Sequence, residues 1–215
     1  MINKITRNQL SDMFQSIADI MADKEEELCK RDAQLGDGDL GLTMKKGFGA
    51  LPKIVQGLES PELSKTIMKA AMLMSSLIPS TMGFLMSSGL MEAGKSLSEK
   101  SFIDADGLVQ FLVGYWNGIV KRGKCSVGER TVLDSMDAAA KAAQEELKKN
   151  PDSSLLQIAI AAEKGAKAGV ERTKFMVPKY GKAAVHKEAC KGIEDQGAVA
   201  GLYVVSAIRN YIETT

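Results

Sequence analysis

Apolar residues recur at helical spacing along almost the whole chain, and this pattern limits the fold more than any other feature. In the first such segment Leu10, Met13, Phe14 and Ile17 follow one another at intervals of three and four residues, so they share one face of an α-helix. The spacing returns in seven further segments, at about residues 42–55, 60–77, 83–93, 106–120, 129–148, 154–168 and 196–211. No segment has a convincing strand pattern. We therefore predict an all-α fold, an antiparallel eight-helix barrel or bundle formed by one domain over residues 1–215.

Local residues mark where several of these helices begin and end. Capping residues predict helix starts at Thr6-x-x-Gln9, Ser60-Pro61, Asp106 and Ser154-x-x-Gln157. Gly94 fits a helix C-cap. Asp32 falls at the end of the first helix, and a glycine-rich stretch over residues 35–41 separates that helix from the second.

Composition excludes several classes of protein. The chain has 28 basic and 27 acidic residues, a formal net charge of +1, whereas a general nucleic-acid binder normally has a basic excess. Cys29, Cys125 and Cys190 are widely spaced, which indicates neither a disulfide framework nor a zinc site and favours a reducing compartment. The chain has neither the apolar core of a signal peptide nor an apolar run long enough to span a membrane. We expect a cytoplasmic protein with no nucleic-acid and no membrane partner.

Two glycine motifs imitate nucleotide-binding signatures. Residues 36–41, Gly-Asp-Gly-Asp-Leu-Gly, match GxGxxG, but a dinucleotide site needs a preceding strand, and the preceding segment is helical. Residues 89–96 match GxxxxGK[ST], yet Leu90 to Ala93 continue an amphipathic helix where a phosphate loop needs flexible backbone. We reject both motifs.

A cluster of acids carries the strongest functional signal. Asp32, Asp37 and Asp39 form the pattern D-x4-D-x-D, and a turn at Gly38 can point the last two carboxylates the same way. A solvated loop with a helix-capping Asp39 would also fit this pattern. Clustered anions repel one another unless a cation neutralises them, and carboxylate oxygens suit Mg²⁺ or Ca²⁺.

The spacing favours magnesium over an EF-hand calcium site. Counted from Asp37, loop positions 5 and 12 are Gly41 and Phe48, which lack the side-chain ligands of an EF-hand. Magnesium commonly combines a few carboxylates with substrate phosphates, and the next helix begins just beyond, with free amides for phosphate oxygens. The cluster thus predicts a site for magnesium and a polyphosphate.

Four motifs, in order along nearly the whole chain, resemble one family. They are the acid cluster, Arg122-Gly123-Lys124 with the segment Val-Gly-Glu-Arg-Thr-Val-Leu-Asp at 127–134, Gly181-Lys182-Ala183, and Asp195-Gln196-Gly197-Ala198. Together they resemble the nucleotide-binding L subunit of dihydroxyacetone kinases. The resemblance implies an eight-helix barrel that holds ADP or ATP and two Mg²⁺ at one end.

The resemblance also assigns residues to that site. It implies that the three aspartates bind the two Mg²⁺ ions, which bridge the phosphates. The implied nucleotide-binding residues are Gly41, Leu42 and Thr43, Ser80 and Thr81, Gly123 and Val132, Lys182, and Asp195, Gln196 and Gly197. Ordinary packing would equally explain Gly123 and Val132, and a solvated loop charge would explain Lys182.

The chain departs from the family pattern at three places. Leu40 replaces a histidine that follows the acids, Ile78-Pro79-Ser80-Thr81-Met82 replaces a glycine-rich turn, and Gln196 replaces a proline. Fewer polar groups can then approach the phosphates, which indicates a divergent member.

The resemblance implies that this chain is part of a larger enzyme. In the family a separate K subunit holds the ketose on a histidine. The sole histidine here, His186, matches no family motif, so we expect it at the surface and predict no catalytic residue in this chain. The K-type subunit is therefore an implied partner.

Several functions remain open from the sequence alone. The leading one is a subunit of a kinase for dihydroxyacetone or a related short ketose. Its phosphoryl donor is either exchanged ATP or a phosphoprotein of the phosphoenolpyruvate-dependent phosphotransferase system. The alternative is a non-catalytic nucleotide sensor that docks on a transcription regulator. A purely structural helical protein would leave the clustered acids unexplained.

Overall fold

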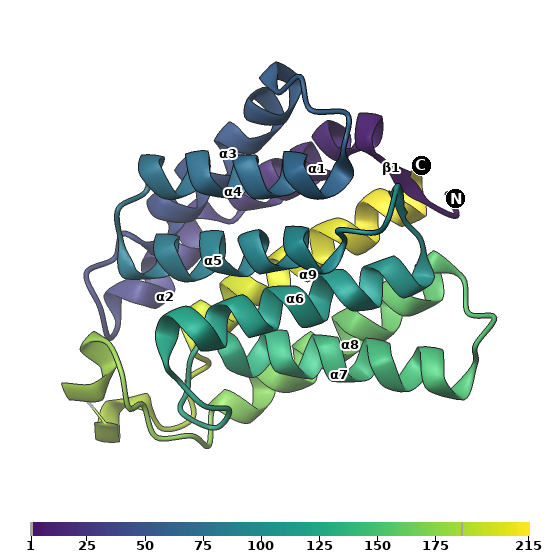
Figure 1. Ribbon diagram of the computed structural model, residues 1–215. Coiled ribbons are helices and arrows are strands. Elements are labelled where there is room, and N and C mark those ends of the chain that lie inside the picture. Colours follow the sequence, from purple (N-terminus) through teal and green to yellow (C-terminus); the bar gives the residue numbers. More distant parts are fainter. Residues whose placement is uncertain (1, 186) are drawn as a thin grey trace.

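The computed structural model describes residues 2–185 and 187–215, and these residues are mostly helical (Figure 1). The described part contains nine α-helices: α1 (Leu10–Asp23), α2 (Glu25–Ala33), α3 (Leu40–Gly57), α4 (Leu63–Leu77), α5 (Thr81–Ser96), α6 (Ala105–Gly123), α7 (Val132–Lys149), α8 (Leu155–Thr173) and α9 (Gln196–Thr214). Three short 3₁₀ helices, η1 (Arg7–Gln9), η2 (Lys182–Val185) and η3 (Lys187–Cys190), and two strands, β1 (Ile5–Thr6) and β2 (Phe102–Ile103), complete them. The expected all-α class is confirmed.

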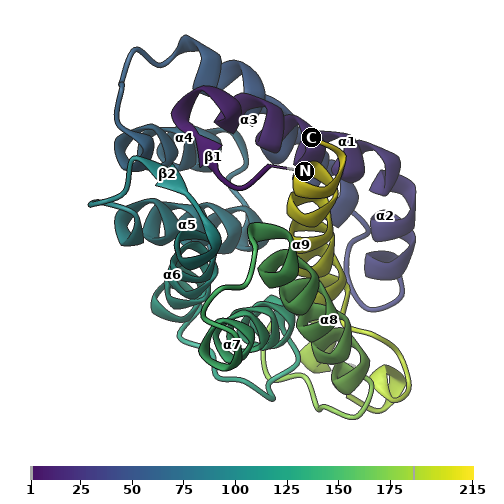
Figure 2. The ribbon, with the colours of Figure 1, turned by 90° about the vertical axis from the view of Figure 1, so that its right-hand side faces the viewer.

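Eight of the helices form a closed ring. Each helix from α3 to α9 packs against the next in sequence, and α1 packs against both α3 and α9. Figure 2 shows α4, α5, α6, α7 and α8 following one another around the outline of the molecule. The remaining helix, α2, lies against α3 and α9. The ring agrees with the predicted barrel, and the ninth helix is an addition to it.

One apolar core joins the ring helices. It draws buried side chains from each of them, including Phe14, Phe48, Tyr115 and Ile208. Burial of this much apolar surface is the main source of stability in such a fold, since the three cysteines form no disulfide within the described part of the chain. Among the described helices, none is both long and apolar enough to cross a membrane.

The prediction of a single N-terminal helix was wrong. The chain forms α1 and α2, which Lys24 separates, and Asp32 therefore ends α2. Helix α2 is highly charged, and its buried residues are Leu28 and Asp32. A nine-residue helix with so small an apolar face has no periodic signal that hydrophobic spacing could detect.

The prediction that the chain has no strand was also incomplete. Ile5 pairs with Ile103 and Thr6 with Phe102 in a two-stranded antiparallel ribbon. Two residues are too few to display the alternation by which a strand is recognised.

Some helix boundaries differ from the sequence prediction. Helix α4 starts at Leu63, two residues after Pro61, and the Ser60 carbonyl accepts a hydrogen bond from Arg7 (2.9 Å). Asp104 caps α6 in place of Asp106. Gly94 lies inside α5, where an added Cβ would be 2.9 Å from Met68, so helix packing explains this glycine. The capping boxes at Thr6 and Ser154 are confirmed.

Because neighbouring helices of the ring run antiparallel, their connecting loops alternate between the two ends of the ring. The connections over residues 34–39, 78–80 and 124–131, and the described residues of the last connection, 174–185 and 187–195, lie at one end, on the left in Figure 1. That end therefore carries the N-termini of α3, α5, α7 and α9. Both chain termini lie at the other end.

Glycine at the α5–α6 contact is required for close packing. A Cβ on Gly118 would be 2.2 Å from the Ser88 carbonyl oxygen, whereas a Cβ on Gly49, on the exposed face of α3, would meet nothing within 4 Å. We predict that Gly118→Ala lowers the free energy of unfolding by about 1–3 kcal/mol through overpacking. Gly49→Ala is the control, and it should be neutral or slightly stabilising because alanine favours helix. Urea unfolding measures both, and equal effects would contradict the prediction.

Candidate functional site

The three aspartates of the acid cluster come together at the loop end of the ring. Asp32, Asp37 and Asp39 each offer a carboxylate oxygen, and these oxygens lie within 4.8 Å of one another. Asp32 is buried, and the other two are exposed. Three hard oxygen donors at this spacing, one at the end of α2 and two on the loop that follows it, fit a magnesium ion that retains several waters or phosphate oxygens as further ligands.

Asp32 organises the loop that carries the other two acids. Its Oδ2 accepts hydrogen bonds from the amides of Gly38 (2.9 Å) and Asp39 (3.2 Å). Glycine is needed at two places in this loop. A Cβ on Gly36 would be 2.5 Å from Asp32 Oδ1, and Gly38 has a φ of 76°, a conformation that residues with a Cβ rarely adopt. The glycine-rich stretch thus folds around a carboxylate.

Asp37 and Asp39 present their carboxylates differently. Asp37 forms an ion pair with Lys182 (2.6 Å), and this contact lowers the pKa of the Asp37 carboxyl. Asp39 occupies the N-cap position of α3, but its side chain makes no capping hydrogen bond. The alternative interpretation, in which the Asp39 side chain caps this helix, is therefore not seen, and its carboxylate stays available to a cation.

The start of α9 closes over the same end. Asp195 is buried; its Oδ2 accepts from the amide of Ala198 (2.8 Å), and its own amide donates to Thr173 (2.8 Å). Burial raises the pKa of Asp195 to about 6. The next residue, Gln196, donates from Nε2 to Asp32 Oδ1 (3.2 Å). This bond joins the last connection of the chain to the first acid of the cluster.

The starts of α3 and α5 hold five of the other predicted nucleotide-binding residues. Gly41 is buried, and a Cβ there would be 2.0 Å from the Glu25 carbonyl oxygen, so this glycine also permits α2 to pack on α3. Leu42 is exposed and Thr43 is half-buried on the first turn. Ser80 is the N-cap of α5, where its hydroxyl accepts from the Gly83 amide (3.0 Å), and Thr81 is the exposed first residue of that helix.

The starts of α7 and α9 lie beside each other. Val132 is the buried first residue of α7, and a Cβ on Gly197 would be 3.4 Å from its amide nitrogen and 3.7 Å from Met82 of α5. Gly123 ends α6 at the same end of the ring. The structure therefore gathers every predicted site residue at one end, although their individual roles stay predictions.

This end combines both signs of charge. The N-termini of α3, α5, α7 and α9 lie at this end, and each carries a partial positive charge. Side chains cap the first turns of α5 and α9, whereas the Asp39 side chain does not cap α3. Carboxylates hold a divalent cation, and uncapped amides hold anionic oxygens. Such an arrangement suits a magnesium-bound polyphosphate.

The sequence analysis missed three charged residues at this end, Arg130, Arg31 and Glu194. Arg130 is buried with a φ of 61° and donates to the carbonyls of Ile193 (3.1 Å) and Glu194 (3.4 Å). Arg31 donates to the Glu194 carboxylate (2.7 Å). Arg130 lies within a quoted motif, but nothing in its sequence neighbours signals a buried guanidinium. His186, expected at the surface, lies outside the described residues.

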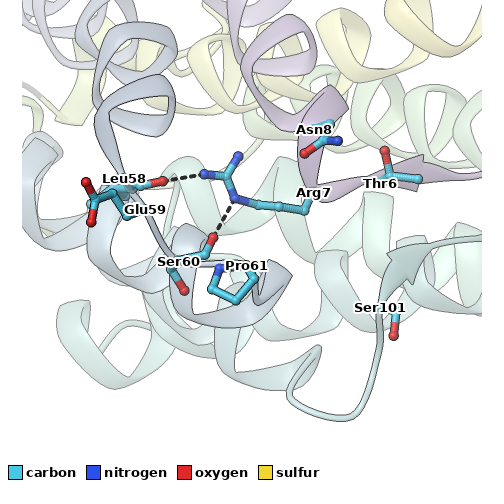
Figure 3. Close-up of a pocket in the computed structure, with 8 residues that line it drawn as sticks. All are labelled: Thr6, Arg7, Asn8, Leu58, Glu59, Ser60, Pro61 and Ser101. Atoms are coloured by element: carbon cyan, nitrogen blue, oxygen red, sulfur yellow. Dashed lines mark hydrogen bonds between the residues drawn. The ribbon is translucent and has the colours of Figure 1, made fainter.

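A cleft of about 430 Å³ lies at the opposite end of the ring. Its main polar side chain, Arg7, serves to cap the end of α3. Figure 3 shows Arg7 in it, with its guanidinium directed at the carbonyls of Leu58 and Ser60. A third bond goes to the Val55 carbonyl (3.2 Å). Arg7 thus satisfies the last carbonyls of α3 and the following turn, and the cleft contains none of the predicted site residues.

The fold and the acid cluster together define an all-α protein: a ring of helices with three clustered aspartates at one end. Residues 34–210 match the family model described as the DAK2 domain. The chain belongs to the DAK2 domain family, which confirms the resemblance to the L subunits of dihydroxyacetone kinases.

Several characterised proteins are similar to this chain. A triokinase/FMN cyclase of Mus musculus is 30% identical over 215 residues, which cover 98% of this chain and 36% of the relative. A probable dihydroxyacetone kinase of Dictyostelium discoideum is 28% identical and is covered to 29% of its length. The chain thus spans about a third of these relatives. The ADP-binding subunit DhaL of the PEP-dependent dihydroxyacetone kinase of Escherichia coli is 21% identical and is covered to 96%.

A solved structure has the same fold. The dihydroxyacetone kinase of C. freundii in complex with AMP-PNP and Mg²⁺ superposes with a TM-score of 0.68 at 23% identity, over 93% of this chain and 33% of that one.

Asp195 gives the site a measurable pH dependence. Its pKa is raised from an ordinary 3.8 to about 6, so between these pH values the folded state holds a proton that the unfolded state has lost. The contribution of Asp195 to the free energy of unfolding therefore falls as pH rises through this window, by about 3 kcal/mol. Asp195→Asn mimics the protonated form and removes this titration. The difference in the free energy of unfolding between the wild type and Asp195→Asn should therefore change between pH 4 and pH 7. A difference that is the same at every pH would contradict the assignment.

Proposed function

We propose that this chain is the ADP- or ATP-binding and magnesium-binding unit of a kinase for dihydroxyacetone or a related short-chain ketose. The phosphoryl group passes from the nucleotide to a ketose bound on a separate K-type subunit. One observation carries this proposal. Asp32, Asp37 and Asp39 cluster at the end of the ring where the N-termini of α3, α5, α7 and α9 also lie.

The relatives support the reaction class. Their names describe dihydroxyacetone kinases, triokinases and ADP-binding subunits, and the similar solved structure is a complex with AMP-PNP and Mg²⁺. Each of these relatives is a kinase or part of one. This agreement favours catalysis over a sensor without activity.

The residues of the chain suggest how it would contribute. The three aspartates would hold two Mg²⁺, which would neutralise charge at the phosphates. The helix starts at Gly41–Thr43 and Ser80–Thr81 would offer amides and hydroxyls to phosphate oxygens. The rest of the nucleotide would be held by Val132, Gly123, Lys182 and the segment 195–197. Catalysis of this kind depends on positioning and electrostatics and requires no covalent step on this chain.

Two phosphoryl donors fit this arrangement. The chain either exchanges ADP for ATP at each turnover or keeps ADP bound while a phosphoprotein of the phosphotransferase system rephosphorylates it. The PEP-dependent subunits of Escherichia coli and Listeria innocua, which this chain matches over 96% and 82% of their length, favour the second mode. Activity with a K-type partner and ATP alone, compared with activity that needs the phosphotransferase relay, distinguishes the two.

Replacement of one metal ligand tests the proposal. Calorimetry of the whole chain should detect binding of ADP with Mg²⁺, and Asp37→Asn should weaken it at least about a hundredfold, because even outer-shell changes at metal sites cost ten- to a hundredfold. Asp152→Asn, an exposed aspartate at the other end, is the matched control. With a K-type partner, Asp37→Asn should abolish phosphoryl transfer.

The proposal fails if the wild-type chain binds no nucleotide in the presence of Mg²⁺, or if Asp37→Asn and Asp152→Asn behave alike. A docking role that survives in Asp37→Asn, without phosphoryl transfer by the wild type, would favour the sensor.

A further inference from the structure

Gln196 makes a hydrogen bond that a proline at this position could not make. Its Nε2 donates to Asp32 Oδ1 (3.2 Å) across 164 residues of sequence. The orientation of the amide follows from chemistry, since an ionised carboxylate only accepts hydrogen bonds. The other amide atom, Oε1, is buried and accepts no hydrogen bond within the described part of the chain.

This bond completes the fixation of Asp32. The backbone amides of Gly38 and Asp39 donate to Oδ2, and the Gln196 side chain donates to Oδ1. Asp32 is only 7% exposed, so these partners set the direction of the remaining lone pairs. By contrast, Asp37 and Asp39 lie on the exposed side of the loop.

The backbone that carries Gln196 is itself held rigidly. Arg130 donates from Nη2 to the carbonyls of Ile193 and Glu194, and its Nη1 lies 3.6 Å from Asp195 Oδ1. The Arg130 side chain is fully buried, and its φ of 61° is costly for a residue other than glycine. Such a conformation persists only where the surroundings enforce it.

A second link runs beside the first. Glu194 accepts from Arg31 (2.7 Å) and pairs with Lys174 (3.3 Å). Arg31 directly precedes Asp32, so the segment 193–196 contacts two successive residues at the end of α2.

We propose that Gln196 is a positioning residue for Asp32, that Arg130 fixes the segment from which Gln196 extends, and that this brace sets the affinity of the acid cluster for a divalent cation. Outer partners of metal-binding carboxylates orient them in this way. The inference rests on the proposed function to the extent that the cluster binds Mg²⁺. It assigns this chain a feature that the Asp-Pro-Gly-Ala pattern of the family lacks.

Two substitutions remove the amide donor in different ways. Gln196→Met keeps the length and volume of the side chain, and Gln196→Pro restores the family residue at the first position of a helix, where proline is tolerated. Gln34→Met, an exposed glutamine beside the same loop, is the matched control. Circular dichroism verifies folding of each full-length variant.

Electron paramagnetic resonance of Mn²⁺, with Mg²⁺ competition, measures the cation affinity, and urea unfolding measures the stability of each variant. Both Gln196 variants should bind Mn²⁺ about tenfold more weakly, whereas Gln34→Met should bind Mn²⁺ as the wild type does. A purely structural role for Gln196 would lower the stability and leave the Mn²⁺ affinity unchanged.

Arg130→Lys tests the second part of the brace. Lysine keeps the charge but loses the guanidinium whose Nη2 donates to both carbonyls while its Nη1 faces Asp195, so Mn²⁺ affinity should fall in the wild-type background. It should fall no further in the Gln196→Met background, because Arg130 acts through Gln196. Additive losses would overturn the role given to Arg130.

The outcomes separate the inference from the proposed function. Wild-type affinity for Mn²⁺ in both Gln196 variants would overturn the inference and leave the proposed function intact. Absence of Mn²⁺ binding by the wild type would overturn both.

Discussion

The packing of α1 against α9 closes the ring of helices. A ring in which neighbours run antiparallel closes only with an even number of members. The described chain has nine α-helices, and the ninth is accommodated because α2 lies outside the ring against α3 and α9. Alternation then places the N-termini of α3, α5, α7 and α9 at one end. The topology alone thus gives this end a partial positive charge, before any particular side chain is considered.

Side chains adapt this end to a cation as well. The helix termini favour anions, yet Asp32, Asp37 and Asp39 gather among them. Their mutual repulsion is offset locally by the amides on Asp32 and by Lys182 on Asp37. Arg31 and Lys174 lie close by on Glu194. A net charge of +1 for the whole chain therefore conceals dense charges of both signs at one end, which is what a magnesium-bound polyphosphate needs.

Sequence reasoning succeeded where one physical signal dominated. Helices with a broad apolar face, such as α1 and α7, were predicted because burial imposes a period on the sequence. The acid cluster was predicted because three anions within eight residues repel one another unless a cation neutralises them. Helix α2 was not predicted as a separate helix because its buried residues are only Leu28 and Asp32. The strands were not predicted because two residues cannot show a period.

The contacts that join distant segments were beyond the reach of local patterns. Arg130 and Ile193 are 63 residues apart, and Gln196 and Asp32 are 164 residues apart. Neither pair has any spacing that would reveal it, since each depends on how the ring closes.

Two departures from the family pattern, Leu40 and Gln196, both change the polar groups around the acid cluster. Leu40 replaces a histidine directly after the acids, and it is 6% exposed in the apolar core, so an apolar side chain stabilises the start of α3 by burial. That replacement removes a polar group from one side of the cluster. Gln196 adds one on the other side, from the start of α9, where it reaches Asp32 directly. A polar side chain is thus absent at the first residue of α3 and present at the first residue of α9. The ring brings these two helix starts to the same end of the molecule.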